Sequence, residues 1–304
     1  MSEIIEVNHL KKYYKTVKAV DDISFNVEKG ELFGFLGVNG AGKSTTINML
    51  CTLLKPTEGE VYLGGYKLGK EDEAIRRLIG VVYQENSLDD KLTVAENLMI
   101  RGSLYESSRK CLKQQMNEVI ELLGLEDILN RRFKRLSGGQ KRRCEIARAL
   151  MHKPEILFLD EPTTGLDPAT RKDVWECVKK LREEMQMTVF LTTHYMEEAA
   201  TATHIAIMDS GKLKQYGTPF SLKEDFANDS LRLIPKELGK IETLLKDKKI
   251  EFEVEDKSLK IKLSNTLAAI DLVADFRQEI SGFEVVQGSM DDVFLKVTGK
   301  VLVG

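Results

Sequence analysis

The sequence lacks any apolar run close to the ~18 residues that a membrane-spanning helix requires. Residues 1–15 contain no apolar core of the kind that secretion signals carry. The net charge is only −3, so there is no broad basic excess to favour a nucleic-acid partner. These absences predict a cytoplasmic protein that does not itself cross a membrane and binds no nucleic acid.

Cysteine is also scarce, and its spacing excludes two kinds of site. The four cysteines, Cys51, Cys111, Cys144 and Cys177, are spread widely and form no C-x-x-C pair. This spacing favours reduced thiols in the cytoplasm over a disulfide framework or a zinc site. Cys144 lies beside a glycine-rich turn, but it fits a small buried side chain on a helix.

The first 219 residues alternate strand-like and helix-like segments. Short apolar runs end near Gly37 and Pro162, a third ends near residue 83, and others follow at 188–194 and 204–213. Between about residues 86 and 135, apolar residues instead recur every three or four positions, which is typical of helices. We therefore predict an α/β domain over 1–219 with a mainly parallel core sheet and an inserted helical subdomain at about 86–135.

The remainder of the chain has a different pattern. Residues 220–229 contain polar and charged residues and show no strong periodicity, so they are predicted to be a linker. Residues 230–304 follow the order strand, helix, strand, strand, helix, strand, with one more helix at the end. This order is that of the split βαβ, or ferredoxin-like, arrangement, and it predicts a small α+β C-terminal domain.

Residues Gly37 to Ser44, GVNGAGKS, match the phosphate-loop pattern G-x-x-x-x-G-K-[ST]. Glycines let successive backbone N–H groups face a phosphate, and the following helix adds the positive end of its dipole. Lys43 is placed to reach the β- and γ-phosphates, and Ser44 to bind Mg²⁺. An incidental glycine-rich turn is the alternative, but the flanking strand and helix favour the phosphate loop.

ILFLDE, residues 156–161, is an apolar strand that ends in two carboxylates. In a phosphate-loop fold, Asp160 holds Mg²⁺ and Glu161 is positioned to polarise the attacking water. Two solvated acids at a strand end are the alternative, but Pro162 ends the strand where a catalytic loop should begin. The two motifs together predict a Mg²⁺-dependent nucleotide hydrolase.

The pentapeptide LSGGQ, residues 136–140, completes a set of motifs. With this spacing the chain resembles the nucleotide-binding subunit of an ATP-binding cassette (ABC) transporter over residues 1 to about 219. In that family two subunits pack head to tail, and the LSGGQ turn of one closes on the ATP held by the phosphate loop of the other. The resemblance thus implies that each chain carries two half-sites. A simple helix cap at Ser137 is the alternative interpretation of LSGGQ, and it is compatible with this role.

The resemblance implies further roles at single positions. Tyr14 matches the aromatic residue that stacks on adenine, with Tyr13 as the alternative, and Gln84 matches the glutamine that senses Mg²⁺. His194 matches the histidine that contacts the γ-phosphate, and Asp167 matches the aspartate that crosses the dimer interface. The implied catalytic residues are Lys43, Glu161 and His194, and the implied metal ligands are Ser44, Gln84 and Asp160. The implied ATP-binding residues are Tyr14, Gly37, Val38, Asn39, Gly40, Ala41, Gly42, Lys43, Ser44, Thr45 and Gln84, and the signature residues are Ser137, Gly138, Gly139 and Gln140.

Three further stretches narrow the resemblance. HYMEEA at 194–199, GTP at 217–219 and SMDDVFLKVTGK near the end resemble the drug-resistance, or daunorubicin-type, exporter ATPases. Members of that group work with polytopic membrane permeases and with a second copy of themselves or a related ATPase. The resemblance therefore implies an export subunit bound peripherally to the inner face of the cell membrane. It leaves the cargo, the homo- or heterodimer and the role of the C-terminal domain open.

Other cassette proteins fit less well. Chromosome-maintenance ATPases carry long coiled coils, and translation-factor cassettes carry two cassettes in one chain, whereas this chain has no sustained heptad array and one LSGGQ. Sugar-importer ATPases have longer β-rich tails. The rival from a different class is a soluble ATP-gated regulator without a membrane partner. The Gln84 region and the helical insertion argue against it, because both have a use where motion is passed to a partner.

Overall fold

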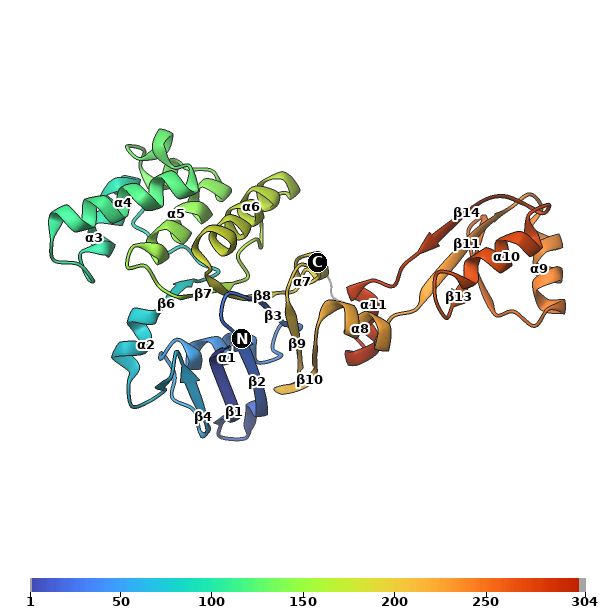
Figure 1. The fold of residues 1–304 in the computed structure, drawn as a ribbon, viewed down its shortest axis with the longest axis horizontal. Coiled ribbons are helices and arrows are strands. Elements are labelled where there is room, and N and C mark those ends of the chain that lie inside the picture. The colour runs from blue at the N-terminus through green and yellow to red at the C-terminus, as the bar shows by residue number, and fades with distance from the viewer. Residues whose placement is uncertain (1, 301–304) are drawn as a thin grey trace. The chain divides into compact units, whose positions relative to one another are not determined.

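The computed structural model describes residues 2–300, and the chain divides into two compact units. The first unit ends at Gly217 and the second begins at Thr218. Both units combine helices and strands, as the sequence predicted (Figure 1).

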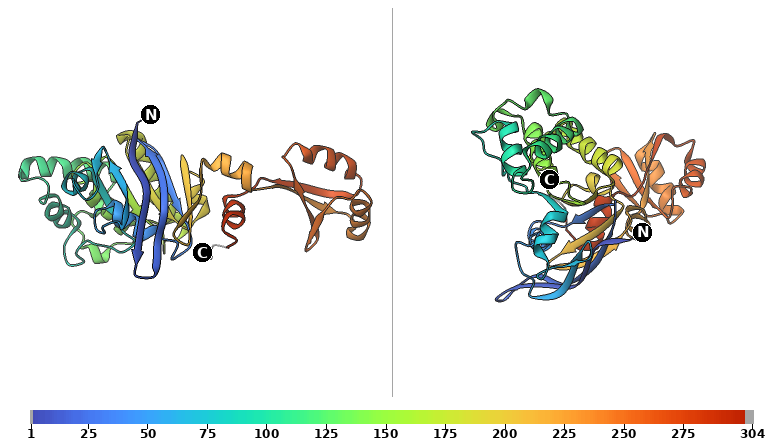
Figure 2. Two further views of the ribbon diagram at one scale, coloured as in Figure 1. Left: turned by 90° about the horizontal axis from the view of Figure 1, so that it is seen from below. Right: turned by 60° about the vertical axis from the view of Figure 1, so that its left-hand side comes forward.

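The first unit contains two sheets. A four-stranded antiparallel sheet has the order β2-β1-β4-β5, and Figure 2 shows the edge strand β2 beside the long strand β1. A six-stranded sheet has the order β10-β9-β3-β8-β7-β6, in which only the edge strand β10 runs antiparallel to its neighbour. The strands are β1 Glu3–Tyr14, β2 Val17–Glu28, β3 Leu32–Leu36, β4 Glu58–Leu63, β5 Tyr66–Lys67, β6 Ile79–Val82, β7 Ile156–Asp160, β8 Thr188–Thr193, β9 His204–Asp209 and β10 Lys212–Gly217.

Both faces of the six-stranded sheet are covered, one by helices and the other by the antiparallel sheet, which explains why its central strands are buried on both faces. All five residues of β3 and all six of β8 are buried, as expected for parallel strands enclosed on both sides. Figure 1 shows α3 to α6 grouped on one side of this sheet, with β1, β2 and β4 on the other. The helices are α1 Lys43–Leu50, α2 Asp72–Leu78, α3 Val94–Gly102, α4 Arg109–Leu123, α5 Gly138–Leu150, α6 Pro168–Met185 and α7 Met196–Ala199.

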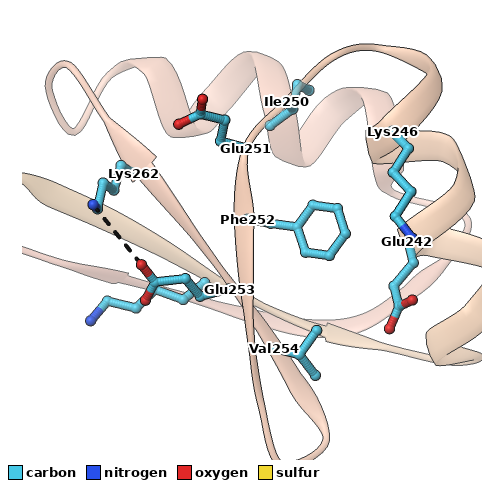
Figure 3. Close-up of a pocket in the computed structure, with 9 residues that line it drawn as sticks. Glu242, Lys246, Ile250, Glu251, Phe252, Glu253, Val254 and Lys262 are labelled. Atoms are coloured by element: carbon cyan, nitrogen blue, oxygen red, sulfur yellow. Dashed lines mark ion pairs between the residues drawn. The ribbon is translucent and has the colours of Figure 1, made fainter.

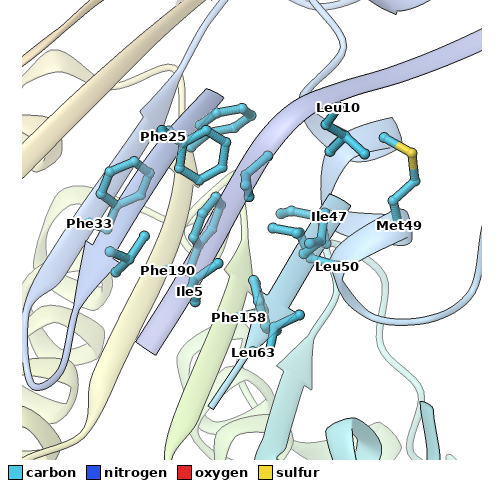
Figure 4. Packing of buried hydrophobic residues seen from close by; sticks show 14 of the residues in the cluster. Ile5, Leu10, Phe25, Phe33, Ile47, Met49, Leu50, Leu63, Phe158 and Phe190 are labelled. Atoms are coloured by element: carbon cyan, nitrogen blue, oxygen red, sulfur yellow. The ribbon is translucent and has the colours of Figure 1, made fainter. Parts of the chain in front are cut away.

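A group of phenylalanines joins the two sheets of the first unit (Figure 4). The rings of Phe25 and Phe33 are stacked with their centres 5.3 Å apart, and Phe190 lies 5.1 Å from both Phe33 and Phe158. Aromatic pairs at these separations add stability beyond the area that they bury. Strand β3 therefore enters the phosphate loop from a rigid support.

The helical insertion between β6 and α5 consists of α3, α4 and two short 3-10 helices, Glu126–Ile128 and Phe133–Arg135. Thr93 begins α3 with a reciprocal capping box, and Gly124 ends α4 in the left-handed conformation. The insertion therefore has defined ends that come from its own sequence.

The second unit contains an antiparallel sheet of the order β12-β13-β11-β14. Its chain order of strand, helix, strand, strand, helix, strand is the ferredoxin-like arrangement expected from the sequence. A separate apolar core, which includes Leu231, Leu233, Ile241 and Ile261, fills the space between this sheet and its helices. The elements are β11 Asp229–Pro235, α9 Leu238–Asp247, β12 Phe252–Glu255, β13 Ser258–Leu263, α10 Ala268–Phe276 and β14 Ile280–Val286.

The stretch 220–229, predicted to be a linker, is instead largely helical. Helix α8, Pro219–Phe226, begins with a Thr218 cap and has proline in its first turn. It packs against the last helix, α11 Met290–Thr298, and buries Leu222. The weak periodicity of the stretch hid a two-turn helix that is stabilised by its cap and by this contact.

Within residues 2–300, no helix combines the length and the apolar character needed to cross a bilayer. All four cysteines are free, with Cys51, Cys144 and Cys177 buried and Cys111 exposed on α4. Burial raises the pKa of Cys144 and of Cys177 to about 12, which makes these two thiols unreactive.

Candidate functional site

The phosphate loop runs from the end of β3 into the first turn of α1, as the motif predicted. Gly42 has φ 108°, and a Cβ at this position would lie 2.5 Å from the carbonyl oxygen of Ala19. Only glycine fits there, because both the backbone conformation and the space exclude a side chain. Lys43 is 5% exposed, and its Nζ donates to the carbonyl oxygen of Gly37 at 2.6 Å. The lysine side chain thus folds back over the phosphate loop, where it is predicted to contact the nucleotide phosphates.

A cavity of about 600 Å³ lies against this loop. It brings Gln84 and Glu161 together with most of the predicted phosphate-loop residues, although these positions are far apart in the sequence. The cavity is lined by Val17, Lys18, Ala19, Val38, Asn39, Gly40, Gly42, Lys43, Ser44, Thr45, Gln84, Glu161, Ser210 and Gly211.

Five of these lining residues were not predicted from the sequence: Val17, Lys18, Ala19, Ser210 and Gly211. Two backbone hydrogen bonds place the β9–β10 turn here, since the Gly211 N–H donates to Ala41 at 3.0 Å and the Gly211 carbonyl accepts from Asp21 at 2.7 Å. The turn signal in DSGK was visible in the sequence, but its contact with the phosphate loop depends on sheet order.

Glu161 is held between two other predicted catalytic residues. Its Oε1 lies 3.6 Å from Lys43 Nζ, and its Oε2 lies 3.4 Å from His194 Nδ1. Thr164 Oγ1 also donates to Oε2 at 3.2 Å. The Glu161 backbone has φ 46°, an uncommon conformation for a residue other than glycine, and such strain often marks functional sites. The fixed carboxylate could accept a proton from a water molecule in the cavity.

Asp160 ends β7 beside this group. Its Oδ1 accepts a hydrogen bond from Thr192 Oγ1 at 2.6 Å, and burial raises the pKa of its carboxyl group. A divalent cation would favour the charged carboxylate that burial disfavours. Magnesium prefers oxygen ligands, typically one or two from the protein besides water and nucleotide phosphates. Asp160, the Ser44 hydroxyl and the Gln84 amide therefore fit Mg²⁺ as donors.

The signature turn forms the start of α5. Ser137 caps the helix by accepting from the Gln140 N–H at 3.3 Å, while the Ser137 N–H donates to Gln140 Oε1 at 3.0 Å. A Cβ on Gly139 would lie 2.3 Å from Thr170 Cγ2, so glycine also permits close packing against the start of α6. None of the predicted signature residues lines the cavity at the phosphate loop. Each chain thus presents the two motifs at separate places.

Asp167 forms the N-terminal cap of α6. Its carboxylate accepts hydrogen bonds from the Thr170 hydroxyl at 2.5 Å and the Thr170 N–H at 3.1 Å, and these bonds lower its pKa. The residue is exposed, so the capping role leaves room for a contact with a second subunit.

Tyr14 ends β1 and is 46% exposed, with Lys12 Nζ 5.1 Å from the centre of its ring. The Tyr13 hydroxyl is engaged instead, since it donates to Asp21 at 2.6 Å. The exposed ring of Tyr14 is therefore the one available for stacking, although the cavity wall nearest to it is formed by Val17 and Lys18.

A second cavity, of about 610 Å³, lies in the C-terminal unit between α9 and the edge strand β12 (Figure 3). Phe252 and Val254 form its apolar side, and three glutamates and three lysines balance one another around it. Glu253 Oε1 lies 3.9 Å from Lys262 Nζ, so this pair is already partly neutralised. The cavity lacks the convergent buried polar groups of the phosphate-loop site.

A phosphate loop on a rigid parallel sheet, a strand ending in two carboxylates and a separate glycine turn define a cassette-type nucleotide hydrolase. Comparison with known proteins agrees: the family model described as ABC transporter matches residues 20–164. The daunorubicin/doxorubicin resistance ATP-binding protein DrrA of Streptomyces peucetius is 38% identical over 305 residues, covering 97% of this chain and 92% of that protein.

Two further matches extend this result. The linearmycin resistance ATP-binding protein LnrL of Bacillus subtilis is 42% identical over 229 residues, covering 75% of this chain and 73% of that protein. Among solved structures, the dimeric ATP-binding cassette MJ0796 bound to ADP and Pi has a TM-score of 0.64 at 32% identity, covering 71% of this chain and 98% of that chain. The chain belongs to the ABC transporter family and is an ATPase. The predicted fold class and the resemblance to drug-exporter ATPases are both confirmed.

Proposed function

We propose that this chain is the ATP-hydrolysing subunit of an exporter, in which ATP binding closes two subunits over two nucleotides. The observation that carries the proposal is the separation of the two half-sites. The phosphate-loop cavity contains Lys43 and Glu161 but no residue of the signature turn at Ser137. A turn capped at a helix N-terminus suits a phosphate bound to a second subunit. The dimeric form of one solved relative supports this arrangement.

Within each site, the residues take the roles that their positions favour. Lys43 and the phosphate-loop N–H groups bind the nucleotide phosphates, and Tyr14 stacks on the base. Glu161 accepts the proton of the attacking water, and His194, beside it, orients that water. Ser44, Gln84 and Asp160 would hold Mg²⁺, which would neutralise charge on the phosphates.

The second subunit completes the site. Ser137, the N–H groups of Gly138 and Gly139, and Gln140 contact the γ-phosphate bound to the opposite chain. Asp167 lies at the interface between the two chains. The partner is a second copy of this chain or a related ATPase.

A membrane permease is the proposed second partner. Ile100 on α3, and Leu104 and Tyr105 in the turn that follows it, are exposed by 53%, 71% and 50%. Exposed apolar groups gathered in one place mark interaction surfaces. Arg101 connects this surface with the Gln84 region, because its Nη2 donates to the carbonyl oxygen of Ser87 at 2.9 Å. The protein therefore binds peripherally at the cytoplasmic face of the membrane, and the names of its relatives favour antibiotic-like cargo.

The experiment is to tag the chain at native expression, solubilise membranes in mild detergent and identify what co-purifies. We expect a polytopic membrane protein in a stoichiometric amount. A variant with serine in place of Ile100 and Leu104 tests the proposed surface. It should recover less of the membrane protein, and its ATP hydrolysis, which serves as the control, should be unchanged. A soluble dimer of the wild-type chain without a membrane protein would favour the ATP-gated regulator instead.

A further inference from the structure

The signature helix α5 carries three charged side chains directed at one segment of the chain. Arg142, Glu145 and Arg148 follow one another at intervals of three residues, and all three contact residues 81–88, which include Gln84. Arg142 is 6% exposed and Glu145 is 1% exposed. Buried charges are costly unless they are paired and hydrogen-bonded, so their bonding pattern should reveal their use.

Arg142 binds the backbone of Gln84 and of the residue that precedes it. Its Nη1 donates to the carbonyl oxygen of Tyr83 at 2.6 Å, and its Nη2 to that of Gln84 at 3.2 Å. The same Nη2 lies 3.5 Å from the carbonyl oxygen of Glu161. One guanidinium group therefore joins the Gln84 backbone to the backbone of the catalytic glutamate.

Glu145 binds the backbone on the other side of Gln84. Its Oε1 accepts from the N–H groups of Ser87 at 2.5 Å and Leu88 at 2.9 Å, and its Oε2 accepts from Ser87 Oγ at 2.9 Å. Arg148 Nε donates to Glu145 Oε2 at 2.9 Å, and Arg148 Nη2 donates to the carbonyl oxygen of Val81 at 2.5 Å. Every charge in this row thus has a partner.

Together these bonds fix the chain on both sides of Gln84, a residue that lines the cavity at the phosphate loop. Helix α5 begins at the Ser137 turn and continues without interruption to Leu150. Since a helix moves as a stiff rod, a displacement of the turn is passed to the charged row and from there to Gln84.

We propose that Arg142 and Glu145 are positioning residues that attach Gln84 to the signature helix. Closure of the Ser137 turn on the nucleotide of a partner then adjusts Gln84 in this chain's own site, so the row couples the two sites. The inference rests on the proposed function, because it requires that the turn contacts a second subunit. If these charged residues only stabilised the fold, contact of the Ser137 turn with a second subunit would leave Gln84 unchanged.

The test is amide hydrogen exchange of residues 81–90 and Mg²⁺ titration in the full-length protein. In the wild type, we expect the Ser87 and Leu88 amides to exchange slowly, and more slowly still with ATP. Glu145→Ala should speed their exchange at least about tenfold, remove the effect of ATP, and raise the Mg²⁺ concentration for half-maximal ATP hydrolysis about tenfold, the scale seen for residues that orient metal ligands.

Arg143→Ala is the matched control. Arg143 lies next to Arg142 on α5, but its Nη1 donates to the carbonyl oxygens of Leu123 at 3.3 Å and Gly124 at 3.4 Å, at the end of α4. This variant should lower the thermal midpoint and leave exchange at 81–90 and the Mg²⁺ requirement unchanged. A milder variant, Arg142→Lys, keeps the charge but loses the planar fork, and it should shift both readouts in the same direction by a smaller amount.

Wild-type exchange and a wild-type Mg²⁺ requirement in either Glu145→Ala or Arg142→Lys would overturn the inference. The same holds if Arg143→Ala shifts both readouts equally, since that would show a general loss of stability. Failure of the proposed function would look different. In that case the wild-type chain would hydrolyse ATP without forming an ATP-dependent dimer, whatever residues occupy positions 142 and 145.

Discussion

The two units of the chain differ in what they bury. The cassette buries charged side chains next to its apolar core, among them Glu31, Lys43, Arg142, Glu145 and Glu198. In the described part of the C-terminal unit, the buried polar or charged residue is Ser230. Charged groups of that unit pair at its surface instead, as Arg232 does with Glu255 at 3.0 Å and with Glu284 at 3.5 Å. Such surface pairs contribute little to stability.

The difference indicates where chemistry occurs. Burying a charge costs several kcal/mol in desolvation, and a fold that needed only stability would do better with apolar residues. Buried charges that persist therefore point to a role such as binding, positioning or motion. In the cassette, Lys43 lies in the phosphate loop, Arg142 and Glu145 bind the Gln84 segment, and Glu198 accepts from Thr193 at the end of β8, next to His194. Glu31 is the exception, since it pairs with His204 at 2.8 Å. In the C-terminal unit the interior is built for stability, which fits a supporting or regulatory module.

The strongest test of this comparison removes one buried charge of the cassette. Glu161→Gln should lower ATP turnover by about 10³-fold, because the carboxylate can no longer accept a proton, while ATP still binds. Phosphate release and the binding of a fluorescent nucleotide measure the two effects. Glu155→Gln is the control, since that side chain is half exposed and pairs with Lys29 at 2.7 Å. Normal turnover in Glu161→Gln would remove Glu161 from catalysis.

Glu161→Gln should also allow the dimer to be detected, because ATP that is not hydrolysed should hold two chains together. Light scattering should show a dimer of Glu161→Gln with ATP and a monomer without it. Adding Ser137→Arg should abolish the dimer, since the bulky side chain fills the turn that contacts the partner's nucleotide. A dimer that survives in the double variant would contradict the composite site.

A change in the core of the C-terminal unit should have a smaller and local effect. Leu233 is fully buried in β11, and Leu233→Ala should cost about 2–5 kcal/mol of that unit's stability. Calorimetry should show an earlier transition for this unit and an unchanged one for the cassette, with ATP hydrolysis preserved below the first. The control is Ile234→Ala, because Ile234 is adjacent and 45% exposed. If ATP hydrolysis is lost when the C-terminal unit unfolds, the cassette and the C-terminal unit are not independent.

The smallest effect is the pH dependence of ATP binding. Burial lowers the pKa of the Lys43 amine, against the opposing effects of Glu161 and Asp160. The amine is charged below this lowered pKa and neutral above it, so ATP affinity should fall by about tenfold as pH rises through it. Lys43→Arg should remove the decline, because arginine stays charged. A decline of the same size in Lys43→Arg would place its origin elsewhere.

Sequence patterns predicted those parts of the site that depend on local geometry. The phosphate loop follows from glycine spacing between a strand and a helix, and the cap at Ser137 follows from the residues of its own turn. The ferredoxin-like order was also predictable, because its strands and helices alternate clearly. The assigned roles of Tyr14, Gln84 and Asp167 still depend on the family resemblance. Of these three, the Mg²⁺ titration bears on Gln84.

What the sequence did not reveal depends on contacts between distant segments. Ser210 and Gly211 line the cavity because β9 lies beside β3, which no local pattern indicates. Arg142 and Glu145 look like the polar face of an ordinary helix, since charge on a helix is usually solvated. The short helix α8 was missed although Thr218 and Pro219 form a recognisable start, because its eight residues give too little periodicity.

The distribution of thiols offers one practical consequence. Cys111 is the single exposed cysteine of the chain, and it lies on α4 in the helical insertion, while the other three are buried. A maleimide dye should therefore attach at one defined position without any engineered substitution. Because that position belongs to the segment proposed to pass motion to the permease, the emission of the dye would follow the insertion through each catalytic cycle.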